Sequence, residues 1–382
     1  MTLSARILPE FAAVDAREWD RLEHADNPFL SPAFLGALEA SGALADELGW
    51  TPSHLALYDD AGLAAFAPTY LKTNSHGEFV FDWAWADAYH RHGLTYYPKL
   101  LTAVPYSPVA GPRLLTRRGH ADPAGLQRRL VQVALDLCAE LDLSSWHCNF
   151  VAADDEAALR SAGLLPRQDL QFHWRNAGYA DFDEFLDCLR ARKRKNIRRE
   201  RRQVAESGVT FRWLRGGELG DAQLDFVHRC YCDTFRQYGN HAALNRAFFE
   251  RLAAELGEGL VVALALRGEE PLAMSLYLLG GGRLYGRYWG CLESLPALHF
   301  EAAYYQGIEF CIEHGVAVFE SGAQGEHKIA RGFRPQPTRS FHYLRDERFR
   351  TAIAGYLDRE RDWIRDYREQ LSVHDPFRRD AA

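Results

Sequence analysis

The sequence lacks the features that mark several protein classes. It contains no uncharged apolar run of about 18 residues, which is the length that a membrane-spanning helix needs. Its first residues reach acidic side chains before any apolar stretch of signal-peptide length. Its seven cysteines are scattered, and the one close pair, Cys230 and Cys232, fits neither a disulfide framework nor a zinc-ligand spacing. We therefore expect a cytoplasmic protein.

Metal-binding motifs and an excess of positive charge are also missing. The fifteen histidines include His24 and the pair His90 and His92, but no H-E-x-x-H or paired Cys/His spacing, so we expect no metal. The chain carries 45 Lys and Arg against 52 Asp and Glu, a net charge of −7, which disfavours a protein that coats nucleic acid. Positive charge is concentrated in RKRKNIRRERRQ (192–203).

The length and an internal duplication predict two α+β domains. A chain of 382 residues exceeds the roughly 250–300 residues at which a single core stops growing. Segments 54–85 and 260–290 share one pattern, in which strand, turn, strand and loop lead to a third strand. That third strand is expected to end at Trp83 and Trp85 in the first segment and at Tyr288 and Trp289 in the second.

A helix and then a strand are expected after each of these segments. Apolar residues at helical spacing predict helices over 126–143 and 298–315, and a last amphipathic helix over 349–371. We predict domain boundaries at 1–176 and 177–345, followed by a C-terminal helix and tail over 346–382.

Three blocks of sequence carry a resemblance to a known family. They are RKRKNIRRERRQV, LYGRYWGCLESLPALHFEAAYYQGIEFCIEHG and FESGAQGEHKIARGFRP. In these blocks the chain resembles the Fem-like predicted N-acyltransferases, relatives of the peptidoglycan aminoacyltransferases that are built from two tandem GNAT domains. The resemblance runs from about Asn27 to the final helix. It implies two tandem GNAT domains and a cytoplasmic enzyme that makes an amide by moving an acyl or aminoacyl group onto an amine.

One departure from the simple GNAT pattern concerns the phosphates of the donor. Acetyl-CoA enzymes of that type hold pyrophosphate on a Gly-rich turn before a helix, whereas this chain has SLPALHFEAAY at that place. The basic segment is therefore a candidate phosphate site, because Arg194, Arg198 and Arg201 fall on one helical face. The alternative is a solvated helix neutralised by Glu200 and Glu206.

Amide formation requires a base for the amine and groups that bind the donor. We expect Glu301 or His327 to be the base, with Glu326 and His299 as further catalytic candidates. Donor or phosphate binding is assigned to Arg194, Asn196, Arg198, Arg199, Lys328 and Arg331. Substrate binding is assigned to Trp83, Trp85, Tyr288, Trp289, Tyr304, Tyr305, Glu320 and Gln324.

Three functions remain open. The leading one is an N-acyltransferase that uses a thioester of CoA or of an acyl carrier protein, with a small-molecule amine or an amino-lipid as acceptor and no covalent intermediate. The second is a Fem-type aminoacyltransferase that uses aminoacyl-tRNA. The third is a noncatalytic protein that binds anions or nucleic acid. We expect no tightly bound cofactor, an acyl-CoA or other acyl donor as co-substrate, and a peripheral contact with the inner face of the membrane as an open alternative.

Overall fold

The computed structural model describes residues 3–322 and 325–378, which form two compact units. The N-terminal unit consists of Met1–Asp169 and Pro337–Asp366, and the C-terminal unit of Leu170–Gln336 and Tyr367–Ala382. The boundary predicted from the sequence, after residue 176, lies seven residues later and leaves each domain continuous. In the structure each unit instead takes in a segment from the far end of the chain.

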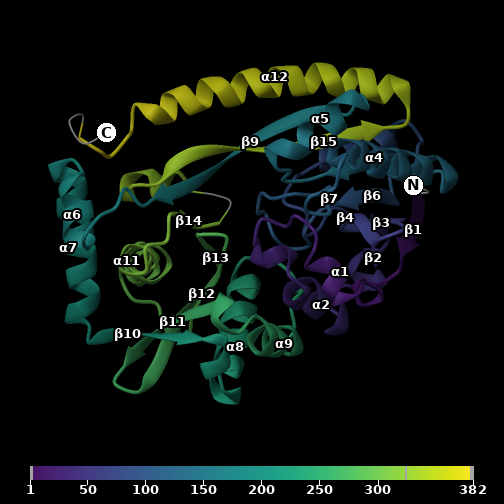
Figure 1. Ribbon diagram of the computed structural model, residues 1–382. Coiled ribbons are helices and arrows are strands. Elements are labelled where there is room, and N and C mark those ends of the chain that lie inside the picture. The colour runs from purple at the N-terminus through teal and green to yellow at the C-terminus, as the bar shows by residue number, and fades with distance from the viewer. Residues whose placement is uncertain (1–2, 323–324, 379–382) are drawn as a thin grey trace. The chain divides into compact units, whose positions relative to one another are not determined.

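The N-terminal unit contains two sheets (Figure 1). One holds β1 (Ser4–Leu8), β3 (His54–Asp59), β4 (Gly62–Ala67) and β7 (Leu115–Thr116) in that order. The other runs from β15 (Arg334–Leu344) through β8 (Ser145–Cys148), β6 (Lys99–Thr102) and β5 (Thr69–Lys72) to β2 (Trp50–Pro52). Short 3₁₀ turns and the helices α1 (Ala16–Trp19) and α2 (Pro32–Ala40) lie between β1 and β2 in the chain.

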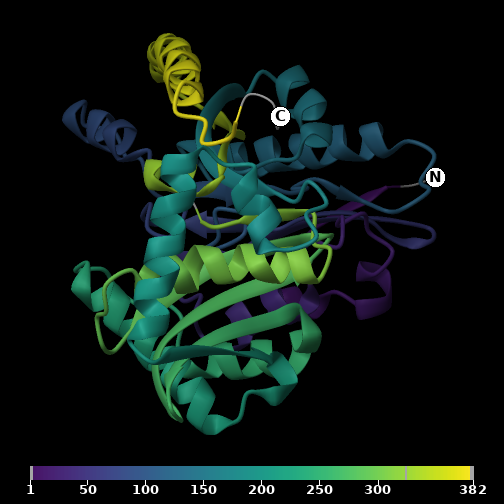
Figure 2. The same cartoon turned by 90° about the vertical axis from the view of Figure 1, so that its left-hand side faces the viewer.

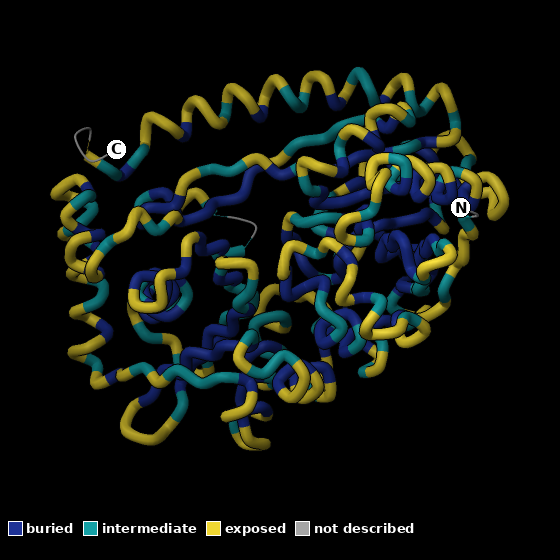
Figure 3. Tube along the Cα trace, viewed as in Figure 1, coloured by how far each residue is buried: buried dark blue, intermediate teal, exposed yellow. Residues whose placement is uncertain are grey.

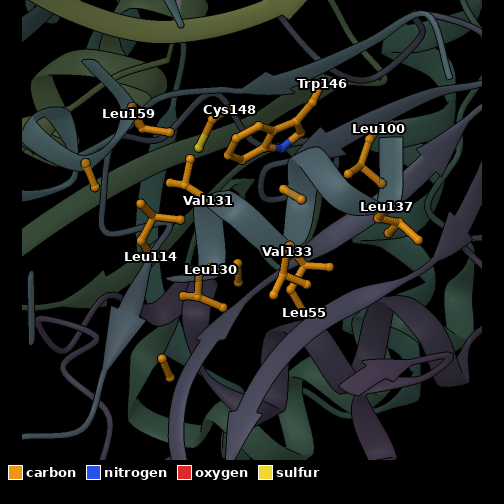
Figure 4. Packing of buried hydrophobic residues seen from close by; sticks show 14 of the residues in the cluster. Leu55, Leu100, Leu114, Leu130, Val131, Val133, Leu137, Trp146, Cys148 and Leu159 are labelled. Carbon is orange, nitrogen blue, oxygen red and sulfur yellow. The ribbon is translucent and has the colours of Figure 1, made fainter. Parts of the chain in front are cut away.

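The core of this unit lies where α4 (Pro123–Glu140) and α5 (Glu156–Ser161) pack on the strands. Leu55, Leu130 and Trp146 are fully buried there, and Figure 4 shows their side chains converging. Phe341 of β15 belongs to the same cluster although it is almost 200 residues from Trp146 in sequence. The segment that starts at Pro337 therefore supplies part of this core.

The other face of β15 is covered by α3 (Trp83–Arg91) and by the first half of α12 (Glu347–Ser372). Trp85 and Tyr89 of α3 pack with Ile353 and Leu357 of α12. The predicted strand ending at Trp83 and Trp85 is therefore wrong. Trp85 and Tyr89 are four residues apart and both buried, which is the spacing of a helix rather than of a strand.

The C-terminal unit contains the predicted three-stranded meander. Strands β11 (Leu260–Arg267), β12 (Glu270–Gly280) and β13 (Arg283–Cys291) pair in antiparallel fashion, and β10 (Val209–Arg215) is added at the edge. On the far side β13 pairs in parallel with β14 (Val318–Glu320), which in turn pairs with the end of β9 (Leu165–Arg175). The meander over 260–290 is thus confirmed.

Helices cover both faces of this sheet (Figures 1 and 2). The segment after β13 forms α10 (Leu298–Phe300), a π-helical turn (Glu301–Tyr305) and α11 (Gln306–Glu313), and the Tyr277 hydroxyl reaches this helix on one face. The other face is covered by α8 (Asp221–Gln237) and α9 (Arg246–Leu256). α8 lies so close to β13 that a Cβ at Gly290 would be 2.4 Å from the Cys230 carbonyl oxygen, which leaves room there only for glycine. The short helix α6 (Phe182–Asp187) precedes the basic helix α7 (Ala191–Glu206).

The internal duplication is located in a strand–helix–strand element of each unit. β6 and β8 pair in parallel with α4 between them in the chain, just as β13 and β14 pair in parallel with α11 between them. The outer neighbour of β8 is β15, from the end of the chain, and the outer neighbour of β14 is β9, from the middle. The position of β15 beside β8 explains why the N-terminal unit takes in a segment from the end of the chain.

Candidate active site

A small cavity of about 90 Å³ lies in the C-terminal unit where β13 and β14 separate. The two strands pair only from Arg283 opposite Val318 to Tyr285 opposite Glu320, after which β13 continues to Cys291 paired with β12 on its other side. The cavity is lined by side chains and backbone of Ser275, Leu276, Tyr277, Gly286, Arg287, Tyr288, Trp289, His299, Ala303, Tyr304 and Ser321.

The π-helical turn points some polar side chains of the second sequence block toward the cavity and others toward α7. α10 begins after Ala297, whose φ of 66° lies in the left-handed region, and the π-helical turn then widens the helix over Glu301–Tyr305. His299 and Tyr304 line the cavity, whereas Glu301 and Tyr305 contact side chains of α7. A regular helix over the whole segment, as the sequence predicted, would not separate these neighbours in this way.

Tyr304 connects the cavity to His327. The Tyr304 hydroxyl lies 2.9 Å from His327 Nε2, and His327 belongs to the 3₁₀ turn Glu326–Arg331. Burial raises the pKa of Tyr304 to about 12, and burial together with Arg331 lowers the pKa of His327. At neutral pH the phenol is protonated and the imidazole is neutral. In the tautomer with its proton on Nδ1, His327 Nε2 accepts from the phenol, and the pair can carry a proton from the cavity to His327.

His299 is the second titratable group on the cavity wall. Its ring lies 5.3 Å from that of Trp289, and burial next to His327 and Arg331 lowers its pKa to about 4. The imidazole is therefore neutral across the physiological range and can accept or donate one hydrogen bond there.

Lys328 and Arg331 hold the loop that follows β14. Lys328 Nζ donates to the carbonyl oxygens of Ser321 (3.0 Å) and Gly322 (2.9 Å), and burial next to Arg287 lowers its pKa to about 7. Arg331 pairs with Glu200 at 3.0 Å and donates to the His327 carbonyl oxygen at 2.9 Å. Both cations thus have protein partners that fix the backbone beside the cavity.

Glu301 faces α7 rather than the cavity. Its Oε1 accepts from Arg201 Nε at 3.2 Å and from Gln306 Nε2 at 2.9 Å, and the side chain is 5% exposed. Burial raises the pKa of Glu301, although Arg201 opposes that shift. Arg201 also pairs with Glu309 at 2.6 Å, so this cluster joins α7 to α11.

The basic helix α7 presents two different faces. On one face Arg194 pairs with Asp187 at 3.3 Å and Arg198 with Asp183 at 2.9 Å, while Ile197 is buried. The other face carries the basic stripe, a row of exposed cations that form no ion pair with any residue in 3–322 or 325–378. The stripe consists of Arg192, Lys195, Arg199 and Arg202, at i, i+3, i+7 and i+10, and Figure 3 shows how exposed this helix is. Asn196 is half-buried beside it.

The remaining expected site residues lie elsewhere. Glu320 is buried at the end of β14 and pairs with Arg283 at 2.7 Å, and Glu326 is exposed and accepts from the Tyr367 hydroxyl. Trp83 and Trp85 belong to α3 of the N-terminal unit, and Gln324 lies outside the described residues.

The structure thus gathers four of the expected residues, Tyr288, Trp289, His299 and Tyr304, around one cavity, with His327 bonded to Tyr304. Ser275, Arg287 and Ser321 line it too, and the sequence analysis did not select them. Arg287 could have been predicted from the sequence, because it is a cation within the otherwise apolar strand segment LYGRYWG. No feature of the sequence marks Ser275 or Ser321 as a site residue.

Two properties of the described chain bear on its chemistry. Within 3–322 and 325–378, no three or more His, Cys, Asp or Glu side chains are grouped so that they can hold a metal ion. In the same residues no helix combines the length and the apolar character needed to cross a bilayer.

Solved structures with a similar fold include three that bear on the assignment. FemX superposes with a TM-score of 0.54 at 13% identity, covering 93% of this chain and all of its own. The structure of L-PGS from Bacillus licheniformis gives 0.52 at 10% identity, with 85% and 95% covered. The C-terminal domain of a putative lysylphosphatidylglycerol synthetase from Agrobacterium fabrum gives 0.51 at 9%, with 91% and 96% covered. The predicted fold, α+β with tandem GNAT-like domains and a C-terminal helix, is confirmed.

Sequence comparison is informative at the level of the family. No curated protein matches the chain in sequence. The model of the FemAB-like family, described as peptidoglycan biosynthesis/recognition, matches residues 10–379, nearly the whole length. The resemblance seen in the three sequence blocks is therefore confirmed: the chain belongs to the FemAB-like family.

Proposed function

We propose that the C-terminal unit transfers an acyl group from a thioester, of CoA or of an acyl carrier protein, to an amine. The observation that carries this proposal is the Tyr304–His327 pair at a cavity between separating strands. The amine nitrogen attacks the carbonyl carbon of the donor, and its proton passes through the Tyr304 hydroxyl to His327 Nε2. The C–S bond then breaks, and His327 returns the proton through Tyr304 to the leaving sulfur, which departs as a thiol. No covalent intermediate is needed when donor and amine are held together.

The cavity wall supports an apolar acyl group. Tyr288, Trp289 and Leu276 line it, and such side chains favour a hydrocarbon chain over a charged group. For the acceptor we propose a lipid-linked or peptidoglycan-related amine, because the family and the similar structures are named for peptidoglycan and lysylphosphatidylglycerol. Such substrates would bring this protein to the inner face of the membrane from the cytoplasm.

A second function, transfer of an aminoacyl group from tRNA, is favoured by the basic stripe on α7. Arg192, Lys195, Arg199 and Arg202 leave a row of positive charge without acidic partners in the described residues. A regular phosphate backbone is a ligand that neutralises such a row, with a strong dependence on salt. The same stripe can bind the phosphates of CoA, so it does not choose between the donors by itself.

A direct comparison of donors tests both functions. Purified protein is incubated with radiolabelled acyl-CoA or with aminoacyl-tRNA, each with lysine-containing peptidoglycan precursor or with an amino-lipid in vesicles, and the amide product is quantified. We expect turnover with acyl-CoA that the Tyr304→Phe variant loses. Turnover with aminoacyl-tRNA alone would assign the second function. Failure with every donor, although native mass spectrometry shows the protein intact, would contradict both.

A further inference from the structure

The N-terminal unit has its own, larger cavity of about 460 Å³. Its wall is formed by residues of the loop before α3, of β9, of β15 and of α12, together with Phe150. Aromatic side chains, among them Phe79, Phe81 and Trp363, line one part of it, and the charged side chains of Arg167, Asp169, Arg339, Arg359 and Glu360 line the rest. Ser340 of β15 also lines it and is 4% exposed. All these residues belong to one unit, so the cavity is independent of the transfer site described above.

A chain of hydrogen bonds starts at Ser340 and leads away from the cavity. Ser340 Oγ lies 2.9 Å from His342 Nε2, and His342 Nδ1 lies 2.7 Å from His147 Nδ1. His147 Nε2 lies 3.0 Å from the Tyr96 hydroxyl, which donates to Asp82 Oδ2 at 2.5 Å. His342 and His147 are register partners on the neighbouring strands β15 and β8, so the backbone pairing fixes their contact.

The neighbouring groups favour one direction for the protons of this chain. Ser144 Oγ donates to the Tyr96 carbonyl oxygen, so it can only accept from Ser145 Oγ, 3.1 Å away. Both Ser145 Oγ and the Tyr96 hydroxyl oxygen are then acceptors for His147, so its Nε2 carries the proton. His147 Nδ1 accepts from His342 Nδ1–H, which leaves His342 Nε2 as an acceptor for the Ser340 hydroxyl.

The far end of the chain is fixed by charge. Lys99 Nζ donates to Asp82 Oδ2 at 2.5 Å and to Glu78 Oε2 at 2.8 Å, and all three side chains are buried. Burial opposes ionisation of Asp82, yet Lys99 and His147 keep its pKa below the usual range. Burial lowers the pKa of His147 to about 3 and that of His342 well below its usual range, so both imidazoles are neutral at rest and each has one donor and one acceptor nitrogen. The Asp82 carboxylate is the charged neighbour that favours a proton on His147.

We propose that Ser340 is the nucleophile of a second site, which takes carboxylic esters or thioesters with an apolar acyl group. The arrangement is that of an activated serine. The Ser340 hydroxyl is bonded to the His342 imidazole, and His342 is oriented by a chain of hydrogen bonds that ends at the Asp82 carboxylate. The aromatic part of the cavity wall supplies the surface for the acyl group.

The reaction would proceed in two balanced steps. Ser340 Oγ attacks the carbonyl carbon while its proton moves to His342 Nε2, and the alcohol or thiol leaves with that proton, which gives an ester on Ser340. Water then attacks the same carbon with His342 as base, and the carboxylic acid and the free serine are released.

An alkyl fluorophosphonate, which reacts with activated serines by losing fluoride, tests the proposal on the whole folded protein. We expect one adduct, located on Ser340 by mass spectrometry of peptides, and no adduct in Ser340→Ala. His342→Gln should slow labelling by about 10² or more, because the base is lost. Ser107→Ala is the matched control: Ser107 is buried in the same unit, has no hydrogen-bond partner among the described residues, and should leave labelling unchanged.

Two outcomes would overturn the proposal. One is a native protein in which Ser340 is labelled no faster than after heat denaturation, and the other is a His342→Gln variant that reacts at the wild-type rate. Thermal unfolding of each variant is measured alongside. If His342→Gln does not fold, Tyr96→Phe replaces it, because it removes one oxygen from the chain; labelling should slow at least about tenfold, and an unchanged rate would contradict the relay.

Discussion

Tyr304 is the residue on which the transfer chemistry depends most directly. Tyr304→Phe keeps the ring on the cavity wall but removes the hydroxyl that reaches His327. We expect kcat to fall by about 10²-fold while KM for the donor changes by less than about threefold, since proton transfer is lost and binding is not. Steady-state kinetics at saturating amine measures both constants.

A matched control separates this effect from general disturbance. Tyr89→Phe removes a hydroxyl that is buried in the N-terminal unit and has no hydrogen-bond partner among the described residues. Its kcat should equal that of the wild type. Turnover of Tyr304→Phe at the control rate would remove Tyr304 from the mechanism.

Lys328 should make stability depend on pH in a defined window. Burial lowers its pKa from 10.5 to about 7, so between these values the unfolded chain holds a proton that the folded chain has lost. The free energy of unfolding therefore rises with pH, by up to about 1.4 kcal/mol per unit, in that window. Lys328→Met removes this contribution, so the free energy of unfolding of the wild type should increase relative to that of the variant as pH rises.

Urea unfolding at about pH 7.5 and about pH 9.5 measures this difference. Lys195→Met is the control, because Lys195 is exposed on α7 and its replacement should shift the unfolding curve equally at both pH values. Parallel pH dependence of Lys328→Met and the wild type would show that the Lys328 ammonium is not destabilised by burial.

Glu301 tests whether a buried carboxylate in this segment is structural or catalytic. Because it faces Arg201 and Gln306, Glu301→Gln should lower the free energy of unfolding by about 1–3 kcal/mol. The loss stays below that of a fully buried ion pair because Arg201 is 25% exposed. Turnover should stay within about threefold of the wild type. A loss of about 10² in kcat without loss of stability would make Glu301 the base instead.

At the scale of elements, the two faces of α7 make different predictions. Arg199 belongs to the basic stripe, and Arg199→Glu should raise KM for a phosphate-bearing donor about tenfold at low salt without changing kcat. If the donor is tRNA, the slope of log K against log salt should fall by about one. Arg251→Glu, an equal charge change at an exposed position of α9, is the control and should leave KM unchanged.

The elements themselves were largely readable from periodicity. The meander over 260–290 and the helices near 126–143 and 349–371 follow from alternation and from apolar residues at helical spacing. The helix over 83–91 could not be predicted in this way, because its aromatic residues favour strands. They pack against α12, which comes more than 250 residues later in the chain. The π-helical turn was also invisible, since its sequence has ordinary helical periodicity.

The site was predictable only where its residues share a sequence block. His299, Tyr304 and His327 come from the two blocks that carry the family resemblance, and they meet beside the cavity. Which neighbours face the cavity could not be read, because that depends on the π-helical turn and on where β13 and β14 separate. The Ser340–His342–His147 chain joins residues almost 200 positions apart, a contact that only the pairing of β15 with β8 creates.

At the scale of the whole molecule, the pairing of β15 with β8 decides which segments can fold together. β8 needs β15 as its antiparallel neighbour, and Phe341 of β15 completes the core around Trp146. A fragment of residues 1–169 lacks both, and burial of a Phe side chain alone contributes about 2–3 kcal/mol. We therefore expect residues 1–169 to lack fixed tertiary packing. The same fragment joined to residues 337–366 by a Gly/Ser linker of about ten residues should fold cooperatively.

Near-UV circular dichroism and thermal unfolding distinguish the two fragments, because Trp146 and Trp85 report packing on opposite faces of β8 and β15. A fused chain in which Phe341 is replaced by Asp is the control for the linker, since it restores the length of the chain but not the core. It should behave like residues 1–169. If residues 1–169 gave the same cooperative transition as the fusion, the N-terminal unit would be a continuous domain, and the segment from Pro337 would only rest on its surface.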